Sequence, residues 1–377
     1  MGDYCGDIET VVYLSLMQSL FFELIRISIG KQKAFSHIPS TKEWEQLYLM
    51  AERQTVLGIC FKTVKETAGS VPQPLYIRWL AMAAKIQQRN EVMNRKCAEV
   101  YEAIRSKGFN SVVLKGQGVA CYYKLRDESL DLRANSLGML RQSGDIDVWL
   151  WKEGLSLKEN RKEVIRFART IQPDATGAEH HVGVEWMDTE VELHYEPAYF
   201  CNPFANRRFR KWFCEYDKSL FLLSENGFCV PDAGFNRVFL LAHAFRHYLS
   251  EGLGLRQVMD YYFLLKAGEH SIAHNSDVMI KKLGMARFEK ALLWVIGYVF
   301  EGKDSEDGRK YGKMLLRHIM DGGNFGKHKV STIASRHTHI GRFINQLAHD
   351  IRLMMYYPSE AVWAPLSMIR EFLRIRI

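Results

Sequence analysis

The chain has 377 residues, 47% apolar and 25% charged, with a formal net charge of +8 and a pI near 9.0. This length allows two or three domains, and the apolar content excludes a largely disordered chain. The positive charge favours anionic partners such as nucleotides, nucleic acid or phosphorylated metabolites, although a basic surface that only aids solubility explains it equally well.

The seven cysteines form no recognisable framework, because their number is odd, their spacing is irregular and no C-x-x-C pair occurs. This pattern argues against disulfides and against a zinc knuckle, and it predicts reduced thiols in a cytoplasmic protein. The acidic first residues do not resemble a signal peptide, and the longest apolar run, near 291–300, is too short to cross a bilayer. We therefore expect no membrane span.

Residues 1–108 are expected to form an N-terminal helical region. Apolar residues recur at helical spacing over 11–30, and the segment 40–69 opens with the S-x-x-E spacing of a capping box at Ser40. The segment 75–108 predicts one or two long helices that end on a glycine.

Residues 109–202 predict a small α/β core. The short β-branched run at 111–116 and the segment 145–151 are expected to be strands, and 180–188 and 190–197 to form a hairpin. The intervening segments are expected to be a short helix at 117–125, a polar loop at 126–144 and a longer helix at 154–171.

Residues 203–377 are expected to form a C-terminal helical region, so the fold class is α+β, with a mixed sheet flanked by helices at both ends. The expected elements are helices at 236–252, 255–268, 283–302 and 360–377, loops at 303–312 and 321–329, and a short pair of strands within 219–232.

Three carboxylates stand out in the central region. Asp145 and Asp147 begin the second strand, and Glu192 shares one face of a later strand with Glu190 and His194. If these strands are neighbours, the acids converge, and their mutual repulsion predicts a divalent cation between them. Hard carboxylate oxygens suit Mg²⁺ or Mn²⁺. The alternative is a solvated strand end, since D-x-D often occurs by chance.

The first strand supplies a possible anion site, because Lys115-Gly116-Gln117-Gly118 closes a strand and opens a helix. Glycines let the backbone approach a phosphate, and a helix N-terminus offers free N–H groups. Lys115 or Arg141 would neutralise triphosphate charge. K-G-x-G is also a common turn, so the order of the motifs supports the hypothesis more than any single motif does.

Two later histidines, His243 and His247, have the i, i+4 spacing that places them on one helix face, and Asp260 follows. A zinc site is conceivable, but the Glu of H-E-x-x-H and a fourth ligand are missing, so a buried polar cluster is the favoured interpretation. Arg256 is a further candidate for phosphate contact. The basic run 207–212 is expected to be a solvated helix face rather than an RNA-binding surface.

Four blocks together resemble a known family. They are 113-VLKGQGVACYY-123, 141-RQSGDIDVWL-150, 191-VELHYEP-197, and 243-HAFRH-247 with 252-GLGLRQVMD-260. They look like the bacterial "uncharacterised nucleotidyltransferase" family, within the superfamily typified by DNA polymerase β, over roughly residues 15–375. The resemblance implies metal-dependent transfer of a nucleoside monophosphate from an NTP, with ATP the expected nucleotide, and release of pyrophosphate.

On this resemblance Asp145, Asp147 and Glu192 become the catalytic metal ligands. The implied nucleotide-binding residues are Lys115, Gly116, Gln117, Arg141 and Arg256.

The chain also departs from the superfamily pattern. Its turn is Gly-Gln instead of Gly-Ser, the turn lies 29 residues (145 − 116) before Asp145, and the third acid is Glu instead of Asp. The acceptor is left open between a small molecule, a protein and RNA. The alternative function is a nucleotide-binding regulatory or scaffold protein without transfer activity, against which the intact trio of acids argues.

Overall fold

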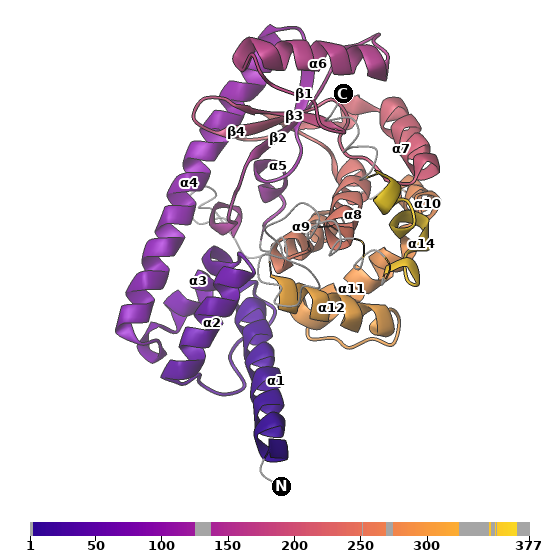
Figure 1. The fold of residues 1–377 in the computed structure, drawn as a ribbon. Coiled ribbons are helices and arrows are strands. Elements are labelled where there is room, and N and C mark those ends of the chain that lie inside the picture. The colour runs from indigo at the N-terminus through magenta and orange to yellow at the C-terminus, as the bar shows by residue number, and fades with distance from the viewer. Residues whose placement is uncertain are drawn as a thin grey trace.

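The computed structural model describes residues 3–124, 137–250, 252–268, 274–323, 347, 351 and 353–367. A four-stranded sheet lies at one end of the molecule, and helices surround it and extend away from it (Figure 1). This is the expected α+β class with a mixed sheet and flanking helices. Among the residues described, no helix has both the length and the apolar character that crossing a membrane requires.

The N-terminal helices are α1 (Asp3–Ser28), α2 (Thr41–Arg53), α3 (Leu57–Glu66) and α4 (Gln73–Ser106). The capping box at the start of α2 is present, because Ser40 Oγ accepts from the Glu43 N–H and Glu43 Oε2 accepts from the Ser40 N–H at 2.7 Å. Thr55, with φ 55°, separates α2 from α3. Helix α4 is a single long helix that runs from the N-terminal helices to the sheet (Figure 1).

The strands of the main sheet lie in the order β1-β2-β4-β3. Their bounds are β1 (Asn110–Val113), β2 (Ile146–Trp151), β3 (His181–Glu185) and β4 (Glu190–His194). Strands β1 and β2 are antiparallel, β2 and β4 are parallel, and β3 and β4 form the expected antiparallel hairpin. The strand that carries the D-x-D motif and the strand that carries Glu192 were expected to be neighbours in the sheet, and this is confirmed.

Alternation along β2 sends its side chains to two different layers. Ile146, Val148 and Leu150 lie in a core with α4 and with α6 (Leu157–Ile171). Trp149 points to the opposite face, where its ring stacks on Phe235 of α8 at a centroid distance of 5.5 Å. Because residues two apart in a strand share a face, Asp147 lies on the face toward α8.

The remaining elements are α5 (Gln117–Ala120), α7 (Pro203–Glu215), β5 (Leu222–Leu223), β6 (Cys229–Val230), α8 (Ala233–Leu249), α9 (Leu255–Ala267), α10 (His274–Lys282), α11 (Ala286–Phe300), α12 (Arg309–Gly322) and α14 (Pro358–Ala361). Strands β5 and β6 pair, as expected within 219–232. Parts of the expected 126–144 and 321–329 loops and of the expected 360–377 helix lie outside the described residues.

The loop expected at 303–312 is wrong at its end, because α12 already begins at Arg309. Gly312 is instead a packing position within this helix. A Cβ at Gly312 would lie 2.4 Å from the Trp294 ring, so only glycine lets α12 approach α11 this closely.

Candidate functional site

Two of the three predicted acids lie side by side in the sheet. Asp147 in β2 and Glu192 in β4 are direct partners in the parallel register, and the Asp147 side chain is 1% exposed. Asp145 directly precedes β2 and is half-buried. Among the described residues, Asp147, Glu192 and His194 have ligand atoms within 4.8 Å of one another, whereas Asp145 is not part of that group.

Two basic side chains neutralise this pair of acids. Lys115 Nζ lies 2.7 Å from Asp147 Oδ1. His194 Nε2 lies 3.0 Å from the same oxygen and 3.1 Å from Glu192 Oε2, and its ring is buried. The carboxylates are therefore held by hydrogen bonds that a divalent cation would have to share or replace.

These contacts shift the pKa values of the group. Burial acts to lower the pKa of Lys115, but the charges of Asp147, Asp145 and Glu192 outweigh it and raise that pKa. Burial acts to raise the pKa of Glu192, but the hydrogen bond and charge of His194 and the charge of Lys115 bring it well below its usual range. Glu192 is therefore ionised at neutral pH, and Lys115 is a lasting positive charge.

The K-G-Q-G turn joins β1 to α5 in a conformation that needs both glycines. Gly116 has φ 57° and ψ −110°, which side chains rarely adopt. At Gly118 a Cβ would lie 2.2 Å from the Val113 carbonyl oxygen, so α5 turns back tightly against the end of β1.

The short helix α5 has few free N–H groups at its start. The Gly118 N–H donates to the Lys115 carbonyl at 2.9 Å, and the N–H groups of the next two residues donate to Gly116. Gln117 is buried, and its Nε2 donates to Asn94 Oδ1 of α4 at 2.5 Å. The turn thus brings Lys115 to the acids, while Gln117 fixes α5 on α4.

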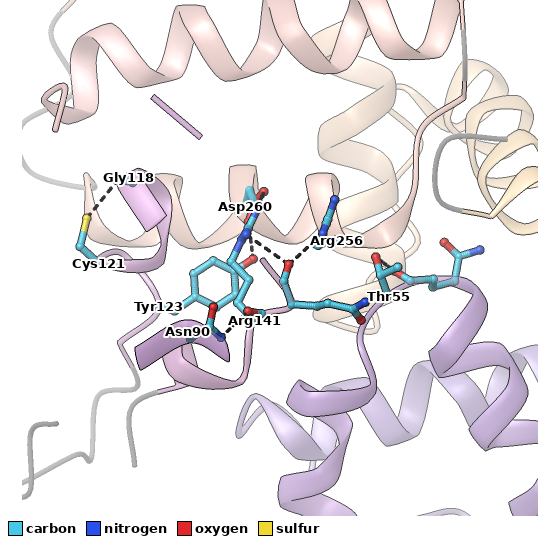
Figure 2. A network of polar contacts seen from close by, with 10 residues as sticks. Thr55, Asn90, Gly118, Cys121, Tyr123, Arg141, Arg256 and Asp260 are labelled. Carbon is cyan, nitrogen blue, oxygen red and sulfur yellow. Dashed lines mark hydrogen bonds and ion pairs between the residues drawn. The ribbon is translucent and has the colours of Figure 1, made fainter. Parts of the chain in front are cut away.

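Arg141, an expected nucleotide-binding residue, lies in a buried ion pair. Its Nε and Nη2 donate to the two carboxylate oxygens of Asp260 in α9 at 2.6 and 2.7 Å, and Tyr123 donates to the same carboxylate at 2.5 Å (Figure 2). Arg141, Asp260 and Tyr123 are all buried. Burial acts to lower the pKa of Arg141, but the charge of Asp260 outweighs burial and raises that pKa above its usual value. This network joins the start of the D-x-D segment to α9.

Arg256 of α9 reinforces the same attachment, since its Nη1 donates to the Gln142 carbonyl at 2.8 Å (Figure 2). On the other side, Asn90 of α4 donates to the Arg141 carbonyl at 2.7 Å. Burial, together with repulsion from Arg141, lowers the pKa of Arg256 to about 10. The residues that lead into Asp145 are therefore held between a helix of the N-terminal region and one of the C-terminal region.

The two later histidines lie one turn apart on α8. The rings of His243 and His247 have centroids 4.3 Å apart. Burial, followed by the charges of Lys115, His247 and Arg246, brings the pKa of His243 well below its usual value. Asp260 is bound to Arg141, and among the described residues it does not join these histidines in a cluster able to hold a metal.

The basic run expected at 207–212 lies on α7. Two of its arginines bond within the chain, Arg210 to Glu196 at 2.7 Å and Arg208 to the Lys282 carbonyl at 3.2 Å.

Sequence reasoning missed two histidines close to the acids and a buried serine that precedes Asp145 in the chain. His180 and His181 were assigned only to a hairpin arm, yet the register of that hairpin places His181 directly opposite His194. The ring of His180 lies 5.0 Å from that of His194. Ser143, two residues before Asp145, is buried, and its hydroxyl has no hydrogen-bond partner among the described residues.

A family model described as "uncharacterised nucleotidyltransferase" matches residues 40–301, a narrower span than the resemblance suggested. The chain belongs to this family. The match includes β1 to β4, both glycines of the turn, the acids and helix α9, and the family description supports a general role in nucleotidyl transfer. Comparisons with curated proteins and with solved structures returned no match.

Proposed function

We propose that the protein transfers a nucleoside monophosphate from an NTP, with ATP the expected nucleotide, to a hydroxyl acceptor and releases pyrophosphate. The observation that supports this most strongly is the pairing of Asp147 with Glu192 on neighbouring parallel strands, with Lys115 held against Asp147 at 2.7 Å. The two carboxylates are suited to a metal ion and the Lys115 ammonium to a phosphate, and a metal-bound nucleotide requires both kinds of group close together.

The oxygen donors of the site fit a hard divalent cation. Asp147 and Glu192 would hold Mg²⁺ or Mn²⁺, and on the family resemblance Asp145 is the third proposed ligand. When bound, such a cation would neutralise phosphate charge and lower the pKa of the acceptor hydroxyl. On the family resemblance, Glu192 is also proposed to accept the proton of that hydroxyl.

The anion half of the site is proposed to consist of Lys115, Gly116 and Ser143. Lys115 is charged and 21% exposed, so it is able to exchange Asp147 for a phosphate oxygen once a cation occupies the acids. Gly116 has no side chain to prevent a phosphate from approaching its backbone, which lies beside that of Asp145. The Ser143 hydroxyl is a buried donor that lacks a partner among the described residues, as a ligand-binding group would before its ligand arrives.

Arg141 and Arg256 are proposed to act through position. Both are occupied by groups of the chain, Asp260 for Arg141 and the Gln142 carbonyl for Arg256. Their effect on the reaction would come from fixing the segment that carries Asp145.

The experiment that tests this function incubates the full chain with α-labelled NTPs, Mg²⁺ or Mn²⁺, and host lysate. Transfer predicts label in one fraction, and that fraction distinguishes a small-molecule, a protein and an RNA acceptor. The double variant Asp145→Ala/Asp147→Ala should lose the transfer, whereas Asp174→Asn, which changes an exposed carboxylate, should retain it. Nucleotide binding without any transfer in wild type would instead support the binding-protein alternative.

A further inference from the structure

Three imidazoles gather beside the acids on the β3–β4 hairpin. His181 and His194 are opposite residues in the antiparallel register, and the His180 carbonyl accepts from the Tyr195 N–H at 3.0 Å. The ring centroids of the three histidines lie between 4.6 and 5.1 Å apart. Each ring offers a nitrogen within 4.8 Å of those of the other two. The sheet backbone therefore fixes three nitrogen ligands at one point.

The unused nitrogens of these rings give the cluster its chemistry. In His180, His181 and His194 the Nδ1 atom is buried and has no hydrogen-bond partner among the described residues. His180 and His194 are 5% and 2% exposed, so water does not readily satisfy them. A buried polar nitrogen without a partner costs about 1–3 kcal/mol, and three such nitrogens in one cluster of rings require an explanation.

His194 is oriented as a metal-binding histidine is. Its Nε2 faces Asp147 Oδ1 at 3.0 Å and Glu192 Oε2 at 3.1 Å, which places a proton on that nitrogen. In the neutral form of the ring, which is the form that binds a metal ion, Nδ1 carries a lone pair. A carboxylate that holds one imidazole nitrogen so that the other can bind a metal is the usual arrangement around histidine-bound zinc.

We propose that His180, His181 and His194 form a binding site for a borderline divalent transition metal such as Zn²⁺, Co²⁺ or Ni²⁺. Imidazole nitrogens prefer these ions, whereas Mg²⁺ prefers the oxygens of Asp147 and Glu192. Three protein ligands leave one position of a tetrahedral ion open to water or a substrate oxygen. The proposal does not rest on nucleotidyl transfer, although the site shares His194 with the carboxylates Asp147 and Glu192.

The charges around the cluster are mixed. Glu192 Oε1 lies 3.6 Å from His181 Nε2 and favours a cation. Arg246 lies over the Tyr199 ring, which in turn lies 5.0 Å from the His180 ring, and its charge opposes a cation there. A phosphate-type anion is therefore the competing occupant, and the experiment distinguishes the two.

The test uses the untagged full chain, stripped of metal and dialysed against Zn²⁺ in excess Mg²⁺, with bound zinc measured by mass spectrometry. We expect one Zn²⁺ per chain that Mg²⁺ does not displace, and Co²⁺ should give a visible ligand-field spectrum. His180→Ala and His181→Ala should each lose both signals. The control His37→Ala, which changes an exposed histidine paired with Glu43, should retain them.

Circular dichroism of each metal-free variant shows whether it folds, and His181→Gln supplies a gentler substitution if the alanine variant does not. Zinc that raises the melting temperature of wild type but not of His181→Gln supports the site. The proposal is wrong if folded His180→Ala and His181→Gln bind as much Zn²⁺ as wild type. It is equally wrong if inorganic phosphate, and not Zn²⁺, raises the melting temperature of wild type.

Discussion

Replacing Arg141 by Met separates the two roles that this residue has been assigned. In the structure its guanidinium makes two hydrogen bonds, at 2.6 and 2.7 Å, to the carboxylate of Asp260, and the two residues are 5% and 6% exposed. Arg141→Met keeps most of the side-chain volume but leaves the Asp260 charge buried without its two guanidinium hydrogen bonds, beside the Tyr123 hydroxyl that still donates to it. If Arg141 served mainly to bind phosphate, the fold would hardly change.

The expected loss is about 3–5 kcal/mol of unfolding free energy, the usual cost of removing one partner of a buried ion pair. The double variant Arg141→Met/Asp260→Leu removes the stranded charge as well and should recover much of the loss, because an apolar pair of similar volume often replaces a buried ion pair. Arg166→Met is the matched control. Its side chain is 73% exposed beside Glu163, so it should change stability by less than about 0.5 kcal/mol.

Urea unfolding followed by circular dichroism measures these differences, and nucleotide titration of the folded variants measures any effect on binding. The reasoning fails if Arg141→Met costs less than about 1 kcal/mol. It also fails if the double variant is as unstable as the single one. A stable Arg141→Met protein with weakened NTP binding would indicate that Arg141 binds phosphate directly.

Three further outcomes follow from the site and its surroundings. Lys115→Met should lower kcat/KM for the NTP by about 10²–10³, because a preorganised positive charge is lost. The control Lys162→Met, which changes an exposed lysine, should not lower it. Equal kcat/KM values for Lys115→Met and wild type would contradict the role of Lys115. Gly118→Ala should lower the free energy of unfolding by about 1–3 kcal/mol, because the new Cβ would lie 2.2 Å from the Val113 carbonyl oxygen. An unchanged melting temperature would refute this close contact. Burial raises the pKa of Glu360 to about 7 from an ordinary 4.5, so its contribution to stability is complete below about pH 4.5 and disappears as the pH rises through about 7. The loss amounts to up to about 3 kcal/mol. Glu360→Gln should flatten the stability profile between about pH 4.5 and 7, and parallel curves for the two proteins would show that this carboxyl does not titrate as described.

The sheet could be predicted because its signals are local. The β-branched run before Gly116, the apolar residues after Asp147 and the turn in the 180–197 hairpin each specify a strand without reference to distant residues. Adjacency of β2 and β4 was a condition of the metal hypothesis, and the parallel register of Asp147 with Glu192 confirms it. The division of the chain at 108 and 202 stays a prediction.

The contacts around the site could not be predicted, because they join residues far apart in the chain. Arg141 meets Asp260 across 119 positions, and no sequence spacing indicates that partner. Likewise, the cluster of His180, His181 and His194 becomes visible only once the register of the hairpin is known. The loop expected at 303–312 was wrong at its end for a similar reason, because Gly312 packs α12 closely against the distant Trp294 ring.

Asp147 and its neighbours are proposed to support nucleotidyl transfer, and the release of pyrophosphate measures that reaction itself. The full chain is assayed with each NTP, Mg²⁺ or Mn²⁺ and the labelled lysate fraction as acceptor, for wild type, Asp147→Asn and the exposed control Asp174→Asn. We predict that Asp147→Asn lowers the rate of release by about 10³ or more while remaining folded, and that the control matches wild type. Equal rates of pyrophosphate release from wild type and folded Asp147→Asn would contradict the account.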